Sequence, residues 1–183
     1  MTSTFLASRI ALVTLSIVLS LPASADEFDN SGRLLQQGKL PEALAQIEAY
    51  LTAHPKDARA RFLKGVVLTG QQKSDEAIAV FSALIEDYPE LPEPHNNLAV
   101  LYASRGEYDK AREQLERALD NRPNYAIAHE NLGDVHAKMA ARSYSRALEL
   151  ADKNPALADK LEALRRLLPE PGAQPQPLSK GKP

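Results

Sequence analysis

Four histidines are the residues of this 183-residue chain that best suit metal binding or acid–base catalysis. His95 and His129 are separated by a 34-residue interval, and His136 follows His129 by seven, which places the last two on one helical face. A metal site needs further ligands and supporting partners, yet the chain has no HExxH spacing, glycine-rich phosphate loop, GxSxG elbow or cysteine. We therefore interpret the histidines as partly buried structural residues, and we expect no metal, no cofactor and no enzyme activity.

The same 34-residue spacing recurs in prolines, alanines and small residues. The recurring residues are Pro55, Pro89 and Pro123; Ala43, Ala77 and Ala111; and Ser31, Gly65, Ala99 and Gly133. A fixed period of this length is typical of stacked helix–turn–helix units. The small residues predict close packing between paired helices, and each proline predicts the end of a second helix.

The clearest unit spans residues 92–125. Its pattern residues are His95, Leu98, Ala99, Tyr102, Ala111, Leu115, Ala118 and Pro123, and Gly106 is predicted to end its first helix. This spacing resembles the tetratricopeptide repeat (TPR), with His95 in place of the usual tryptophan. The resemblance implies an all-α solenoid of antiparallel helix pairs, with three regular repeats, an irregular fourth and a C-terminal capping helix.

The expected repeats cover about 26–57, 58–91, 92–125 and 126–153, and the capping helix covers 154–168. The fourth repeat is irregular because Tyr144, Ala147 and Leu148 arrive about five residues early. Two alternatives remain open for it: a shortened turn between two helices, or one continuous helix.

The two ends of the chain differ from the repeats in composition. Residues 1–25 combine Arg9, a short apolar run and Ala23-Ser24-Ala25, which predicts a signal peptide cleaved after Ala25. We therefore expect export, to the periplasm of a Gram-negative cell or outside the cell, with no stable membrane span in the mature chain; an uncleaved signal anchor is the alternative. The proline-rich residues 169–183 predict a disordered tail.

The charges of the chain nearly balance. It carries 22 Lys and Arg against 24 Asp and Glu, a formal net charge of −2. A nucleic-acid-binding protein would show a basic face, so we expect no nucleic-acid partner.

The resemblance also implies a concave groove lined by the first helix of each repeat. The candidate peptide-binding residues are Phe28, Arg59, Phe62, Val66, Asn96, Asn97, Val100, Glu130, Asn131, Asp134 and Lys138. Asn97 and Asn131 are separated by one repeat period and would contact a peptide backbone, although asparagine is also a common surface residue of such helices. Some relatives clamp a C-terminal carboxylate with Lys, Asn and Arg. The corresponding residues here are Phe28, Gly32, Leu63, Glu93 and Asn97, of which only Asn97 fits, so we do not expect this mode of recognition.

Two functions follow as hypotheses. The first is a non-enzymatic adaptor that binds a peptide or protein client in the groove, in cell-envelope assembly or secretion. The alternative is a structural protein that forms a homo-oligomer through the irregular fourth repeat and the C-terminal helix.

Overall fold

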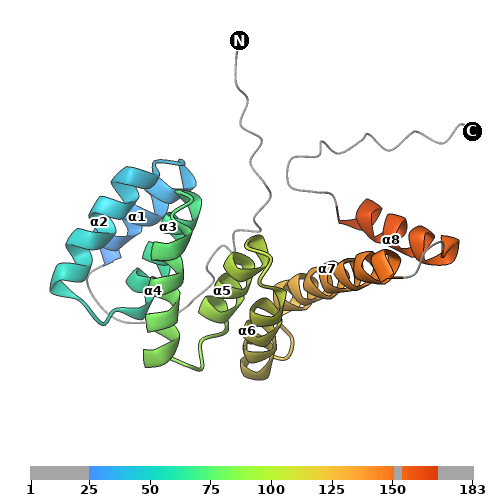
Figure 1. Ribbon diagram of the computed structural model, residues 1–183. Helices are drawn as coiled ribbons and strands as arrows, with labels where there is room; N and C mark the ends of the chain where they lie inside the picture. Colours follow the sequence, from blue (N-terminus) through green and yellow to red (C-terminus); the bar gives the residue numbers. More distant parts are fainter. Residues whose placement is uncertain (1–24, 151–153, 169–183) are drawn as a thin grey trace, which may run out of the picture. The chain divides into compact units, whose positions relative to one another are not determined.

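The structure, a computed structural model, describes residues 25–150 and 154–168. These residues form eight α-helices and no strand (Figure 1). The helices are α1 (Ala25–Gln36), α2 (Leu40–Ala53), α3 (Ala58–Gly70), α4 (Ser74–Asp87), α5 (Pro92–Ser104), α6 (Tyr108–Asn121), α7 (Ala126–Leu150) and α8 (Pro155–Leu167). The described residues divide into two compact units at Leu132, within α7. The predicted signal peptide, apart from Ala25, and the predicted disordered tail lie outside the described residues.

The first unit is built from consecutive helix pairs. Contacts join α1 to α2, α3 to α4 and α5 to α6, and the second helices α2 and α4 also contact the first helix of the next pair. The first helices α1, α3 and α5 contact their neighbours in turn. This arrangement confirms the expected all-α solenoid.

The turns within the three pairs share one backbone conformation. Gly38, Gln72 and Gly106 recur at the repeat period, and each has a positive φ, of 72°, 62° and 74°. The residue after each of them donates its backbone N–H to a carbonyl five residues earlier, as Glu107 does to Tyr102 at 3.0 Å. This geometry ends a helix and favours glycine, because a residue without Cβ adopts positive φ without strain.

The core lies between the paired helices. Ala43, Ala77 and Ala111 on the second helices are fully buried, as are Ile47, Phe81 and Leu115 four residues further on. The tightest approach is at Gly65 on α3, where an added Cβ would lie 2.5 Å from Cε1 of Phe81 on α4. The recurring small residue is therefore required in the second repeat for the two helices to pack.

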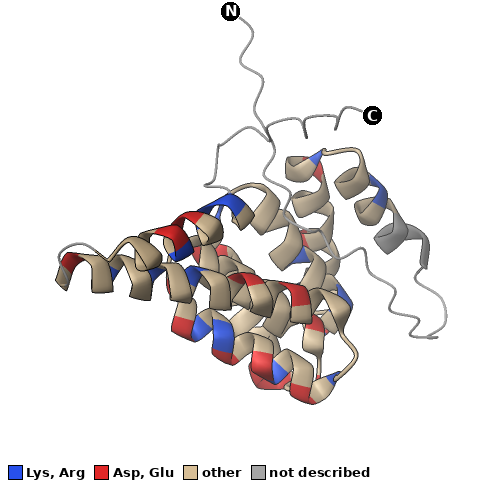
Figure 2. Cartoon of the chain, turned by 90° about the vertical axis from the view of Figure 1, so that its right-hand side faces the viewer, with Lys and Arg blue, Asp and Glu red and all other residues tan. Residues whose placement is uncertain are grey.

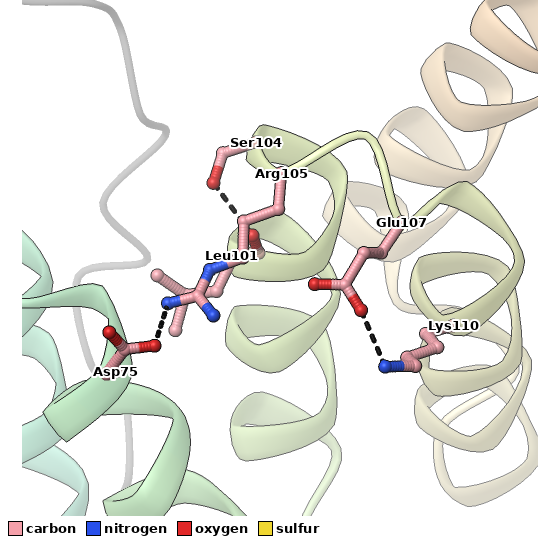
Figure 3. A network of polar contacts seen from close by, with 6 residues as sticks. All are labelled: Asp75, Leu101, Ser104, Arg105, Glu107 and Lys110. Carbon is pink, nitrogen blue, oxygen red and sulfur yellow. Dashed lines mark hydrogen bonds and ion pairs between the residues drawn. The ribbon is translucent and has the colours of Figure 1, made fainter.

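Polar contacts at the surface add to this packing. At the end of α5, Arg105 pairs with Asp75 of the preceding repeat at 2.7 Å, and Glu107 pairs with Lys110 at 2.6 Å (Figure 3). The hydrogen bond from Lys110 to Glu107 raises the pKa of the Lys110 ammonium. These groups are largely exposed, so each pair contributes little to stability.

Helix α7 settles the two alternatives for the fourth repeat. From Ala126 to Leu150 the chain is one continuous helix of 25 residues, α7 (Figure 1). Asn154 then caps α8 by accepting a hydrogen bond from the Leu157 backbone N–H at 3.2 Å. On α8, Lys160 lies over the Tyr144 ring of α7, 5.9 Å from its centroid. The expected helix beyond the repeats is present, and its role as a cap stays a prediction.

We find no helix in residues 25–150 and 154–168 that combines the length and the apolar character needed to cross a membrane.

Candidate binding surface

Two of the apolar residues expected to line the groove belong to the core. Phe62 is 3% exposed, and its ring centroid lies 5.7 Å from that of Phe81; Val66 is 7% exposed in the same cluster. The prediction that these two side chains form an open groove floor is therefore wrong. The physical reason is that α3 contacts four other helices, α1, α2, α4 and α5, and the face that carries Phe62 and Val66 packs into the core.

The asparagines are engaged with the fold to different degrees. Asn96 is 1% exposed, and its Oδ1 accepts a hydrogen bond of 2.8 Å from Nδ2 of Asn131. Asn96 is thus a buried link from α5 to the start of α7, and its expected place in the groove is corrected. Asn97 is half-buried and donates from Nδ2 to the Glu93 carbonyl at 2.8 Å. The half-buried side chains of Asn97 and Asn131 therefore each donate one hydrogen bond from Nδ2 to another group of the fold.

The remaining candidates are distributed along the chain. Arg59 and Glu130 are exposed and Val100 is half-buried, whereas the side chain of Phe28 lies outside the described residues. Asp134 and Lys138 belong to the second unit, and their role stays a prediction. The described surface thus concentrates on the residues of α5 and the first turns of α7, which the Asn96–Asn131 hydrogen bond joins. We call Asn97, Val100, Glu130 and Asn131 the α5–α7 seam.

A partly buried polar cluster lies close to this seam. The Glu93 carboxylate pairs with the Arg122 guanidinium, which lies 4.4 Å from the centroid of the Tyr125 ring. Tyr125 is 5% exposed, and among the described residues no group forms a hydrogen bond with its hydroxyl. Burial, and next the Glu93 charge, raise the pKa of Tyr125 to about 12, while Arg122 acts in the opposite direction. Because burial disfavours the phenolate, the hydroxyl stays neutral.

Sequence reasoning missed Arg122 and Tyr125 as members of this cluster. One signal was available, since Tyr125 stands one repeat period after Leu91 and puts a phenol where the preceding repeat has an aliphatic side chain. The contact of Glu93 with Arg122 carries no sequence signal, because the two residues are 29 positions apart and do not share a repeat position.

The histidines make contacts that join successive repeats. His95 is buried, with Nε2 3.1 Å from the Pro89 carbonyl oxygen, and His129 donates from Nε2 to the Pro123 carbonyl at 2.9 Å. His129 and His136 are exposed, which corrects the expectation that all of these rings are partly buried. Within the part of the chain that the structure describes, no group of three or more His, Asp or Glu side chains is arranged to hold a metal ion.

Charge is mixed along the described helices rather than gathered by sign (Figure 2). On α6, Arg112 lies 3.6 Å from Asp109 and 3.7 Å from Glu116, at the spacings that bring side chains together on a helix surface. The charge-dense segment of α6 is therefore a solvated helix face.

Comparison with known proteins defines the class of this fold. Two family models described as the tetratricopeptide repeat match residues 33–92 and 101–139, together more than half of the chain. No curated protein sequence matches. The chain is thus a member of the tetratricopeptide repeat family.

Solved structures show the same fold. The first TPR domain of human RPAP3 is similar with a TM-score of 0.61 at 16% identity, over 65% of this chain and 94% of that domain. The first TPR of Spaghetti (RPAP3), bound to the HSP90 peptide SRMEEVD, gives 0.60 at 16% identity over 63% of this chain and 91% of that one. YrrB, described as a TPR protein with an unusual peptide-binding site, gives 0.54 at 27% identity, over 57% of this chain and 54% of that protein.

Proposed function

We propose that this protein is an exported, non-enzymatic adaptor that binds an extended segment of a client protein at the α5–α7 seam. The observation that carries the proposal is the chemistry of the seam: half-buried Val100 offers apolar area, and half-buried Asn97 and Asn131 offer amide groups on the two helices that the Asn96–Asn131 hydrogen bond joins. An amide oxygen accepts hydrogen bonds from a peptide backbone without reading its side chains. Peptide binding by YrrB and by the Spaghetti domain supports this use of the fold.

The seam suits an internal segment of a client better than a free C-terminus. At the positions where a carboxylate clamp would carry basic or amide side chains, the chain has buried Leu63 and acidic Glu93. Glu93 already occupies Arg122, so a second carboxylate would have to compete for that guanidinium. Recognition then depends on the backbone of the client segment and on those of its apolar side chains that pack against Val100.

Export and a role in envelope assembly or secretion follow from the predicted signal peptide and form part of this proposal. Expression from Met1, followed by cell fractionation and mass measurement, tests export directly. We expect a mass that corresponds to a chain beginning at Asp26 in the fraction outside the inner membrane. An unprocessed mass in the cytosol would contradict the exported adaptor.

Site-specific photocrosslinking tests the seam. A photoreactive amino acid replaces Val100 in one protein and exposed Arg117 on α6 in its matched control, and both are irradiated in soluble envelope extract. We expect a discrete foreign-protein adduct only at Val100, and Asn97→Ala should reduce its yield about 2- to 10-fold, the worth of one hydrogen bond. Equal labelling at both sites, or adducts only with copies of this chain, would refute the adaptor function.

A further inference from the structure

The continuous helix α7 contains both halves of the fourth repeat without the turn between them. The fourth repeat aligns with the third if a gap of five residues is placed in the fourth. The second-helix residues Ala111, Leu115 and Ala118 then correspond to Ala140, Tyr144 and Ala147. The missing residues correspond to 104–108, which run from the last residue of α5 to the first residue of α6 and include the positive-φ Gly106. The second half of α7 therefore keeps the pattern of a second helix, but it cannot fold back onto the first half.

The surface that this second helix should cover is open. In the second repeat, Phe81 covers Gly65 so closely that an added Cβ would clash with its ring. Gly133 holds the same position in the fourth repeat, and no atom of the described residues lies within 4 Å of a Cβ placed there. The residue equivalent to Phe81 is Tyr144, which sits on the same straight helix, about 16 Å along its axis. Tyr144 thus cannot reach the Gly133 of its own chain.

We propose that a second copy of this chain supplies the missing helix. Gly133, Ala137, Ala140 and Tyr144 are spaced by three or four residues and share one face of α7. An antiparallel copy of α7 would place the partner subunit's Tyr144 over Gly133, and symmetry would repeat the contact around a two-fold axis near Lys138 and Met139. Such an interface is self-complementary and closes as a dimer.

A second copy fits this surface better than an unrelated partner, because the sequence already encodes the helix that completes it. Loss of the turn between two paired helices removes the fold-back within one chain but leaves both packing surfaces intact. These are the conditions under which copies exchange an element. The Tyr144 ring is half-buried, and Nζ of Lys160 lies 5.9 Å from its centroid, at the outer limit of a cation–π interaction, so this contact holds the ring only weakly.

Disulfide trapping tests this geometry, since the chain has no cysteine of its own. A Gly133→Cys protein and a Tyr144→Cys protein, each expressed from Met1, are mixed and oxidised. Within one helix these positions are about 16 Å apart, far beyond the Cα separation of a disulfide, so the bond forms only between copies. The other Gly133–Tyr144 contact of the mixed dimer stays intact.

We expect a disulfide-linked dimer from the mixture and not from either protein alone. The matched control mixes Gly133→Cys with Arg142→Cys, because exposed Arg142 lies on the opposite face of α7. Failure to link in the mixture, or linking equal to that of the control, would overturn the proposal.

Solution mass gives a second, independent test. By size-exclusion chromatography with light scattering, the unmodified protein should have the mass of a dimer. Gly133→Leu should lower this mass by half without loss of helicity, because a Cβ at this position has no described side chain within 4 Å and the leucine would occupy the place of the partner subunit's Tyr144. Arg142→Leu should remain dimeric. A concentration-independent monomer of the unmodified protein would contradict the exchange, whatever the outcome at the α5–α7 seam.

Discussion

Replacing Gly65 with alanine should destabilise the second repeat, although alanine is the better helix former. Gly65 lies inside α3, and an added Cβ would lie 2.5 Å from Cε1, 2.6 Å from Cζ and 3.0 Å from Cδ1 of Phe81. Carbon atoms in contact prefer about 3.5–4.0 Å, so the ring must move by about 1 Å. Phe81 is fully buried and packs against Phe62, so its displacement disturbs the core around it.

Two opposing effects set the size of the change. Overpacking of a well-packed core costs about 1–3 kcal/mol. The change from glycine to alanine inside a helix by itself raises the free energy of unfolding by roughly 0.5–1 kcal/mol. The middle values of these two ranges differ by about 1 kcal/mol, and we expect Gly65→Ala to lower the free energy of unfolding by about that amount.

Urea unfolding followed by circular dichroism in the far ultraviolet measures this difference. Gly32→Ala is the matched control, because Gly32 lies inside α1 and a Cβ there meets no described atom within 4 Å. The control should gain roughly 0.5–1 kcal/mol. If Gly65→Ala proves as stable as Gly32→Ala, then the close approach of α3 and α4 does not constrain this position, and the reasoning fails.

Three further predictions test separate features of the fold. Tyr125→Phe should raise the free energy of unfolding by about 1 kcal/mol at neutral pH, because it removes a buried hydroxyl without a partner. The pKa of Tyr125 rises in the fold from 10.0 to about 12, so stability should fall as pH rises from 10 towards 12, and urea titrations should show a smaller fall for the variant. Gln72→Gly should add about 1 kcal/mol in thermal unfolding by relieving a positive φ; an unchanged midpoint would argue against strain there. Inserting Ser-Arg-Gly-Glu-Tyr, copied from residues 104–108, after Ala137 should let α7 fold into a hairpin and give a monomer by light scattering, and a persistent dimer would argue against exchange.

The proposed seam and the proposed dimer rest on different residues and can succeed or fail separately. Asn97, Val100 and Asn131 belong to the first compact unit, whereas Gly133 and Tyr144 belong to the second. A dimer that also binds a client would present two seams, and linked sites bind a multivalent client more tightly than either site alone. Crosslinking at Val100 in the Gly133→Leu variant separates the two functions.

The sequence by itself determined the features that repeat along the chain. The 34-residue period identified the helix pairs, the buried alanines on the second helices and the turn at Gly106. These features are local: a residue's place on its helix and the conformation of a turn depend on neighbours within a few positions. The same period predicted the close approach at Gly65, because a large apolar residue recurs at the position of Phe81 in each of the three regular repeats.

Only the tertiary structure decided which of the candidate side chains remain accessible. Val66 and Val100 are separated by one repeat period and so hold equivalent positions, yet Val66 is in the core and Val100 is half-buried. The Asn96–Asn131 hydrogen bond likewise joins two segments that no local pattern relates. The burial of the Tyr125 hydroxyl, for which the described residues offer no hydrogen-bond partner, also depends on the packing of distant segments. The physical reason is that burial depends on every helix packed around a residue, whereas periodicity reports only which face of its own helix the residue occupies.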